Sequence, residues 1–95
     1  MSPPDDPDRA EGRFTVTNEL GLHFRAAAMV VRISSDFKSK ITISNGKTQA
    51  DAASVLDLMT LAASMGTSLT VIAEGSDADA AVSALGALIA RNFAE

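Results

Sequence analysis

The chain has 95 residues, and its apolar share of 46% is enough for the core of one compact domain but not of two. The net charge is −4, and the sequence has neither a basic stripe nor interleaved aromatic residues, which argues against a nucleic-acid partner. Cysteine is absent, which excludes a disulfide framework, a thiolate zinc site and a cysteine nucleophile.

Residues 1–12 differ in composition from the rest of the chain. They hold all three prolines and four acidic residues but only two apolar ones, too little burial to offset the entropy of ordering. We predict an acidic, disordered tail over 1–12 and one domain over 13–95. The tail lacks an apolar segment, and the longest uncharged run, 58–73, is shorter than a bilayer span. We therefore expect a cytoplasmic protein with no secretory signal and no membrane insertion.

Short-range patterns predict the first two elements of the domain. Apolar residues alternate with threonine from Arg13 onward and predict a short strand, which the Glu-Leu-Gly sequence at 19–21 ends. Residues 24–35 combine good helix formers with one apolar face, and so predict a helix. The residues of this helix that we expect to face inward are Ala27, Val30, Val31 and Ser34.

A β-hairpin is the clearest local prediction. Residues 40–44 alternate isoleucine with polar residues, and residues 47–50 can return as a second strand. Between them, Asn45-Gly46 favours a type I′ turn, in which both central residues have positive φ. Strands joined by so tight a turn pair antiparallel.

The last part of the chain predicts a helix, a strand and a final helix. Residues 53–64 have helical spacing, and we expect that helix to end near Gly66, where a residue at positive φ is wanted. Residues 69–73 alternate as a strand, and Ser76 is expected to cap the final helix with Asp79 three residues later. The expected inward residues are Val55, Leu58, Met59 and Ala62 in the first helix, and Val82, Leu85, Ile89 and Phe93 in the second.

The predicted element order is therefore β-α-β-β-α-β-α. Three amphipathic helices and only four strands favour helices that cover one face of a sheet. We predict an α/β (α+β) fold, an open-faced two-layer sandwich.

The only histidine, His23, stands where phosphate chemistry would need it. It lies in G-L-H-F-R just before the first predicted helix, whose first backbone N–H groups have no intrahelical partner and attract anions. A neutral imidazole has one unprotonated nitrogen that can attack phosphorus, and the guanidinium of Arg25 can bind phosphoryl oxygens. From position and composition alone, however, a helix cap or a half-buried loop histidine is the favoured interpretation.

A resemblance to a known family changes this balance. GLHFRAAA at 21–28 resembles the active-site motif of the histidine-containing phosphocarrier protein family, HPr. NGK at 45–47 is similar to the hairpin of that family, and ASVLDLMTL at 53–61 is similar to its regulatory-serine helix. The resemblance extends over about residues 13–93 and includes the EGSDADAA sequence before the last helix.

The resemblance implies a four-stranded antiparallel sheet with the three helices on one face. It implies that His23 accepts a phosphoryl group at Nδ1 from Enzyme I, itself charged from phosphoenolpyruvate, and passes it to an enzyme II A-type domain. Arg25 would steady the phosphohistidine. Such a carrier is not an enzyme that completes a reaction alone, and we expect a monomer with no cofactor and no metal.

The same resemblance implies a regulatory site and a docking face. Ser54 would be phosphorylated by an ATP-dependent kinase, which adds a serine kinase/phosphorylase to the expected partners. An N-cap of the second helix explains Ser54 equally well. The implied partner-docking residues are Phe24, Ala28, Arg32, Val55, Leu56 and Met59.

Three residues depart from the family pattern. Phe24 replaces a small residue after the histidine, and it either packs into the fold or forms an apolar anchor for a partner. Ala26 replaces a proline after the arginine, which should leave the start of the helix more mobile. Ala53 replaces the lysine that often precedes the serine in regulated members, which weakens the case for Ser54.

The motif leaves three functions open. The first is a carrier in a sugar transport relay, and the second is a carrier in a regulatory branch such as a nitrogen-related one. The third is a regulatory interaction module that binds a transcription factor or an enzyme and uses phosphorylation only as a switch. A metal-binding or hydrolytic function is disfavoured, because one histidine without cysteine or a carboxylate cluster offers too few ligands.

Overall fold

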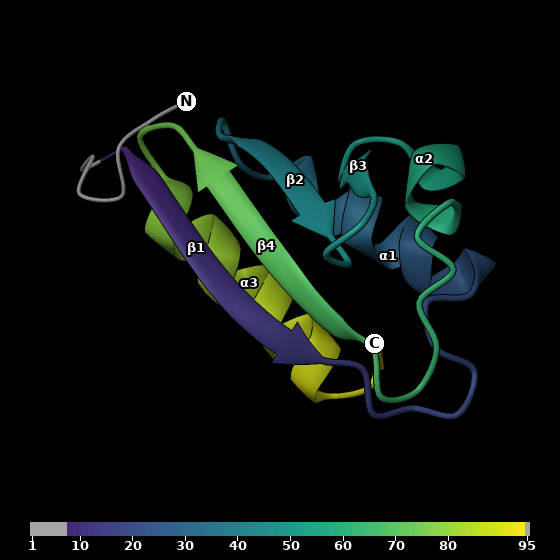
Figure 1. Cartoon of the computed structure of the whole chain (residues 1–95). Helices are drawn as coiled ribbons and strands as arrows, with labels where there is room; N and C mark the ends of the chain where they lie inside the picture. Colours follow the sequence, from purple (N-terminus) through teal and green to yellow (C-terminus); the bar gives the residue numbers. More distant parts are fainter. Residues whose placement is uncertain (1–7, 95) are drawn as a thin grey trace.

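The computed structural model describes residues 8–94, so residues 1–7 of the predicted tail lie outside the described residues. The element order is the predicted one, β-α-β-β-α-β-α (Figure 1). The elements are β1 (Arg9–Thr15), α1 (Phe24–Ser34), β2 (Lys40–Ser44), β3 (Gln49–Asp51), α2 (Val55–Met59), β4 (Ser68–Glu74) and α3 (Ala78–Ala90). The strands form one sheet in the order β1-β4-β2-β3, and each neighbouring pair is antiparallel.

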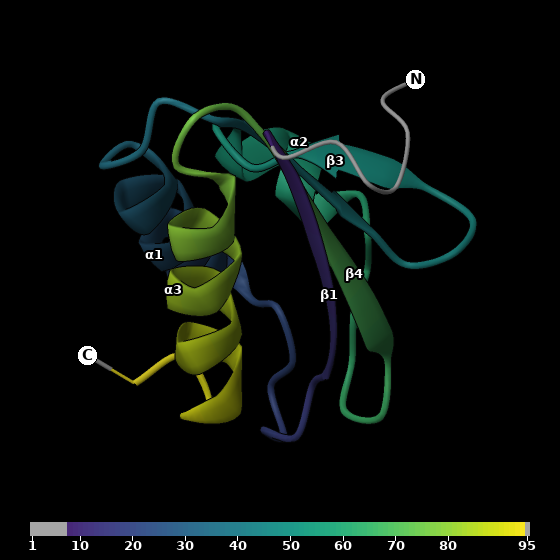
Figure 2. The same cartoon turned by 90° about the vertical axis from the view of Figure 1, so that its left-hand side faces the viewer.

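The molecule has two layers, and the predicted open-faced sandwich is confirmed. Helices α1 and α3 lie on one side of the sheet (Figure 2), while α2 packs against α1 and β3. The apolar residues of β4 alternate inward as predicted, and α3 faces them with its own apolar side. The largest fully buried side chains are Val16, Val30, Ile43, Leu58, Leu69, Val71, Leu85, Leu88 and Ile89.

Strand β1 begins earlier than predicted. It starts at Arg9, opposite Glu74 of β4, so residues 9–12, which we expected in the tail, belong to the sheet. Backbone pairing with β4 extends the strand, and such pairing depends little on the side chains of the paired residues. Gly12 allows α3 to pack closely against β1, because a Cβ there would lie 2.8 Å from Cγ1 of Val82 on α3.

The predicted hairpin forms, but its turn is not the expected type I′. Ser44 pairs with Gln49, so the loop covers residues 45–48, and Gly46 has a positive φ of 93° whereas Asn45 does not. The side chain of Asn45 explains the longer loop. Its Oδ1 accepts the backbone N–H groups of residues 47 and 48, and its Nδ2 donates to the carbonyl of Leu61 at 3.0 Å.

Helix α2 is much shorter than the predicted helix over 53–64. It ends at Met59, and Ala62 adopts a left-handed conformation with φ of 47°. Leu58 is buried as expected, but Met59 and Ala62 are exposed, so their predicted inward positions are wrong. Gly66 has the predicted positive φ, 94°, in a turn beyond the helix rather than at its end.

The final helix is capped differently from the prediction. Its N-cap is Asp77 rather than Ser76. The Asp77 carboxylate makes no capping hydrogen bond to the helix and binds the loop before β2 instead. It accepts hydrogen bonds from the hydroxyl and N–H of Ser39 and from the N–H of Lys38. These donors, the Ser39 hydroxyl foremost, lower the pKa of Asp77 below the ordinary aspartate value, because they stabilise the ionised carboxylate. Val82, Leu85 and Ile89 are buried on this helix as predicted. Phe93 is buried too, but it lies beyond the helix, which ends at Ala90.

Candidate functional site

His23 is the N-cap of α1, and its ring faces the start of that helix. Its backbone is extended, with φ of −77° and ψ of 176°, and its carbonyl accepts the first helical hydrogen bond from Ala27 N–H at 2.9 Å. Its Nδ1 accepts a hydrogen bond from the N–H of Ala26 at 3.3 Å. A ring nitrogen that accepts an N–H carries a lone pair, so the neutral ring has its proton on Nε2. The capping interpretation of His23 is correct, and in this geometry Nδ1 is the ring nitrogen that carries the lone pair.

Two loops hold His23 in position. The loop before α1 and the loop before β4 are joined by backbone hydrogen bonds from Leu22 N–H to the Ala63 carbonyl at 2.9 Å and from Gly66 N–H to the Val16 carbonyl at 2.7 Å. Gly21 makes this approach possible. Its φ is +64°, and a Cβ there would lie only 2.3 Å from the Ala63 carbonyl oxygen. The backbone on the N-terminal side of His23 is thus held by contacts that a larger residue would break.

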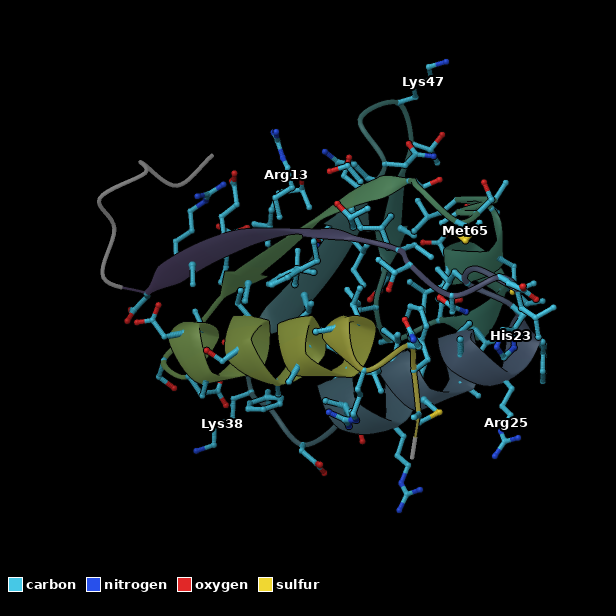
Figure 3. All side chains as sticks on the ribbon, turned by 90° about the horizontal axis from the view of Figure 1, so that it is seen from below. Arg13, His23, Arg25, Lys38, Lys47 and Met65 are labelled. Carbon is cyan, nitrogen blue, oxygen red and sulfur yellow. The ribbon has the colours of Figure 1, made fainter. Side chains whose placement is uncertain are left out.

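The electrostatic surroundings of His23 suit an anion. The first turn of α1 contains no acidic residue and presents backbone N–H groups at its start. Arg25 lies in the same turn, is exposed, and extends outward from the beginning of α1 (Figure 3). An exposed guanidinium on a long side chain can turn toward a phosphoryl group once one is present.

Large apolar side chains are exposed on α1, on α2 and in the two joined loops next to His23. Phe24 is 64% exposed, so it does not pack into the fold. Leu56 is 79% exposed. Met65 lies at the same end as His23 (Figure 3). We call the exposed residues Leu20, Phe24, Leu56, Met59 and Met65 the apolar surface. Exposed apolar side chains gathered around one polar site are typical of a protein-docking surface.

The structure brings the predicted docking residues onto two neighbouring helices. Helices α1 and α2 are in contact, and Ala28 and Val55 are half-buried on them. Arg32 is exposed in the last turn of α1, beside a shallow cavity of about 380 Å³ that Met29 and Arg91 also line. Arg32 thus stands about two and a half helical turns from His23.

Sequence reasoning did not find two residues of the apolar surface, Leu20 and Met65. Both lie in the joined loops, next to Gly21 and Gly66, and neither belongs to a periodic pattern. A large apolar residue beside a loop glycine was the available signal. Its meaning depended on the two loops lying side by side.

Ser54 is the N-cap of α2, as the capping interpretation predicted. Its hydroxyl oxygen accepts the N–H of Asp57 at 3.1 Å, and the Asp57 carboxylate accepts the N–H of Asp51 at 2.7 Å. The serine is half-buried and directly precedes Val55 and Leu56, two of the predicted docking residues on α2.

Two further features concern the described residues, 8–94. No group of three histidine, cysteine, aspartate or glutamate residues there could hold a metal ion. No helix in that part of the chain is long and apolar enough to span a bilayer.

Known proteins are similar to this chain both in sequence and in architecture. Residues 10–91 match the family model described as the PTS HPr component phosphorylation site. The chain is 44% identical to the phosphocarrier protein NPr of Shewanella violacea, over 92% of this chain and 96% of that protein. It is 41% identical to the phosphocarrier protein HPr of Cupriavidus necator, over 85% and 91%. The crystal structure of HPr-C-His from Thermoanaerobacter tengcongensis matches with a TM-score of 0.85 at 35% identity, over 90% of this chain and 97% of that one.

Proposed function

The chain belongs to the HPr family of phosphocarriers of the phosphotransferase system, and on that premise we propose that His23 is its phosphoryl acceptor. The observation that carries the proposal is the geometry of Nδ1. Its lone pair is held at the start of α1, among N–H groups that favour negative charge.

The proposed reaction is a phosphoryl transfer between histidine carriers. The Nδ1 lone pair attacks phosphorus of the phosphorylated Enzyme I while the bond from phosphorus to the donor breaks and its electron pair stays with the donor. The proton on Nε2 remains there. Transfer to an enzyme II A-type domain repeats the step in the opposite sense, so the chain is a carrier and completes no reaction alone. We propose that this relay operates in the cytoplasm.

Incubation with Enzyme I and phosphoenolpyruvate tests the proposal. Intact mass spectrometry should record one added phosphoryl group, lost in acid and kept in base, as expected of phosphohistidine. An unmodified mass after complete charging of Enzyme I would overturn the proposal.

Adding enzyme II A-type domains to the charged protein then identifies the branch. Transfer to a sugar-specific domain assigns the sugar relay, and transfer to a nitrogen-type domain assigns the regulatory branch. A charged protein that passes its phosphoryl group to neither domain supports the alternative, an interaction module switched by phosphorylation.

We propose that Arg25 stabilises the phosphohistidine. Arg25→Ala should leave labelling possible, because the helix N–H groups remain, but slow transfer about tenfold through loss of one charge-assisted hydrogen bond. The matched control is Arg13→Ala, which removes an equally exposed arginine on β1, away from His23 (Figure 3). Assays that follow phosphoryl transfer over time should give a lower rate for Arg25→Ala than for Arg13→Ala. Equal rates in both would remove Arg25 from the mechanism.

The apolar surface and the docking residues of α1 and α2 are the proposed contact for both partners. Exposed aromatic and long apolar side chains at the centre of an interface carry much of its binding energy. Phe24 is then an anchor rather than a core residue, which agrees with its 64% exposure. We take the monomer to be the unit that docks.

Ser54 is the proposed regulatory position at the edge of this contact. Ser54→Asp keeps a good N-cap, so the fold should survive, but it adds negative charge beside Asp57 on the docking side. We expect a modest loss of Enzyme I affinity, about twofold to fivefold, mainly in association rate and smaller at high salt. Titration calorimetry at low ionic strength measures it, with the exposed Ser83→Asp on α3 as the charge-matched control. Equal affinities for wild type and both variants would leave Ser54 as a helix cap only.

A further inference from the structure

The N–H of Ala26 makes the capping hydrogen bond at the start of α1. The hydrogen-bond ladder of the helix begins with Ala27 N–H, which donates to the His23 carbonyl at 2.9 Å. The N–H before it, that of Ala26, donates instead to Nδ1 of His23 at 3.3 Å. One backbone donor of the first turn is therefore committed to the atom that the proposed function makes the nucleophile.

This contact has a direct chemical consequence for the unphosphorylated ring. The donor requires an unprotonated Nδ1, and so selects the tautomer with its proton on Nε2. It also aims the lone pair of Nδ1 at the helix start, where an incoming phosphoryl group meets favourable N–H dipoles.

We propose that the Ala26 N–H is a positioning donor that passes from Nδ1 to a phosphoryl oxygen when His23 is charged, an inference that rests on the proposed function. Forming the bond from Nδ1 to phosphorus consumes the lone pair that this N–H bound. A phosphoryl oxygen, carrying negative charge, then takes over the donor in a stronger, charge-assisted hydrogen bond. The exchange favours the charged form of the carrier over the free form.

The identity of residue 26 controls this donor. Every residue except proline carries a backbone N–H, and proline is the residue that the family pattern has at this position. Ala26 is fully buried, so a bulky side chain would not fit there, but glycine would keep the N–H without adding volume. Proline is tolerated within the first helical turn, because that turn's N–H groups are outside the ladder, although it restricts the preceding residue.

Spectroscopy of the wild-type chain tests the proposal without any variant. At pH 8, long-range ¹H–¹⁵N spectra of the free protein should identify Nδ1 as the unprotonated nitrogen. Charging with Enzyme I and phosphoenolpyruvate should then move the Ala26 amide proton downfield by more than the amides of the next turn. A free protein with its proton on Nδ1, or an Ala26 amide that does not move on charging, would overturn the inference.

A pair of variants tests the energetic consequence. Ala26→Pro removes the N–H, and the equilibrium constant for charging by phosphorylated Enzyme I should fall about fivefold, the difference between a charge-assisted and a neutral hydrogen bond. Ala26→Gly keeps the N–H and should remain within about twofold of wild type, given the small cost of glycine at a first turn.

The outcomes separate this inference from the proposed function. If wild type is charged and Ala26→Pro charges equally well, the positioning donor is refuted while His23 remains the acceptor. If glycine lowers the constant as much as proline does, backbone order rather than the N–H is responsible, and the inference fails. If wild type is not charged at all, the proposed function fails first. Should Ala26→Pro not fold, the spectra of the wild-type protein decide alone.

Discussion

Replacement of His23 by alanine is expected to abolish phosphoenolpyruvate-dependent labelling completely. The chain has no second histidine, so no other imidazole can take the phosphoryl group. The fold should persist, because the ring is half-buried and its side-chain hydrogen bond is the cap to Ala26 N–H. Loss of an N-cap costs about 1 kcal/mol, which lowers the melting temperature of a domain of this size by about 4–8 °C.

His23→Asn separates the two roles of this residue. Asparagine is a good N-cap but has no nucleophilic nitrogen, so this variant should recover stability and remain unlabelled. Intact mass spectrometry and thermal unfolding measured on the same samples report both quantities. Labelling of either variant would mean that another residue is the acceptor.

Replacement of Gly21 by alanine is expected to give the largest loss of stability. Its φ of +64° is unfavourable for any residue with a Cβ, and here the Cβ would also lie 2.3 Å from the Ala63 carbonyl oxygen and 2.8 Å from the Ser64 Cα. Both atoms belong to the backbone, so the two loops must move apart. Backbone strain and overpacking together should cost about 3 kcal/mol, or a melting temperature lower by roughly 15 °C.

Gly66→Ala is the matched control in the neighbouring loop. Its φ is +94°, but a Cβ there would meet nothing within 4 Å, so this variant experiences the conformational strain alone. We expect a loss of about 1–2 kcal/mol. The difference between the two variants' free energies of unfolding gives the cost of disturbing the close approach of the two loops, where Leu22 N–H bonds the Ala63 carbonyl. Gly21→Ala should also slow phosphoryl transfer, because it displaces the backbone next to His23. Equal stabilities of the two variants would refute the structural role of Gly21.

Elements with a strong local pattern were predicted correctly from the sequence. Strand β2 has its predicted bounds, and the residues that alternation and helical spacing placed inward on β4 and α3 are buried. The alternation gave Leu69, Val71 and Ala73, and the helical spacing gave Val82, Leu85 and Ile89. Their side chains report directly which face meets the core, so the periodicity of the sequence contains the answer. The prediction of His23 as the acceptor had a different basis, because its position alone favoured a helix cap and only the resemblance of the contiguous motif to a known family favoured phosphorylation.

Element ends and turns required the tertiary structure. Strand β1 extends to Arg9 because β4 offers a pairing partner along its whole length. The paired residues lie far apart in the chain: Gly12 and its partner Val71 are separated by 59 positions. Helix α2 stops at Met59 so that the chain can turn at Ala62 and bring the Ala63 carbonyl to Leu22. A helical pattern that continues through residue 64 carries no information about such a contact.

The sequence by itself determined the element order and the inward faces of β4 and of the final helix, because each depends on residues close together in the chain. Its contiguous motif also predicted His23 as the phosphoryl acceptor. The tertiary structure decided what surrounds that histidine. It joined two loops through the backbone of Leu22 and Ala63, and it brought the apolar surface together from four separate segments. These features depend on distances between backbone atoms of packed segments, which no local pattern of side chains encodes.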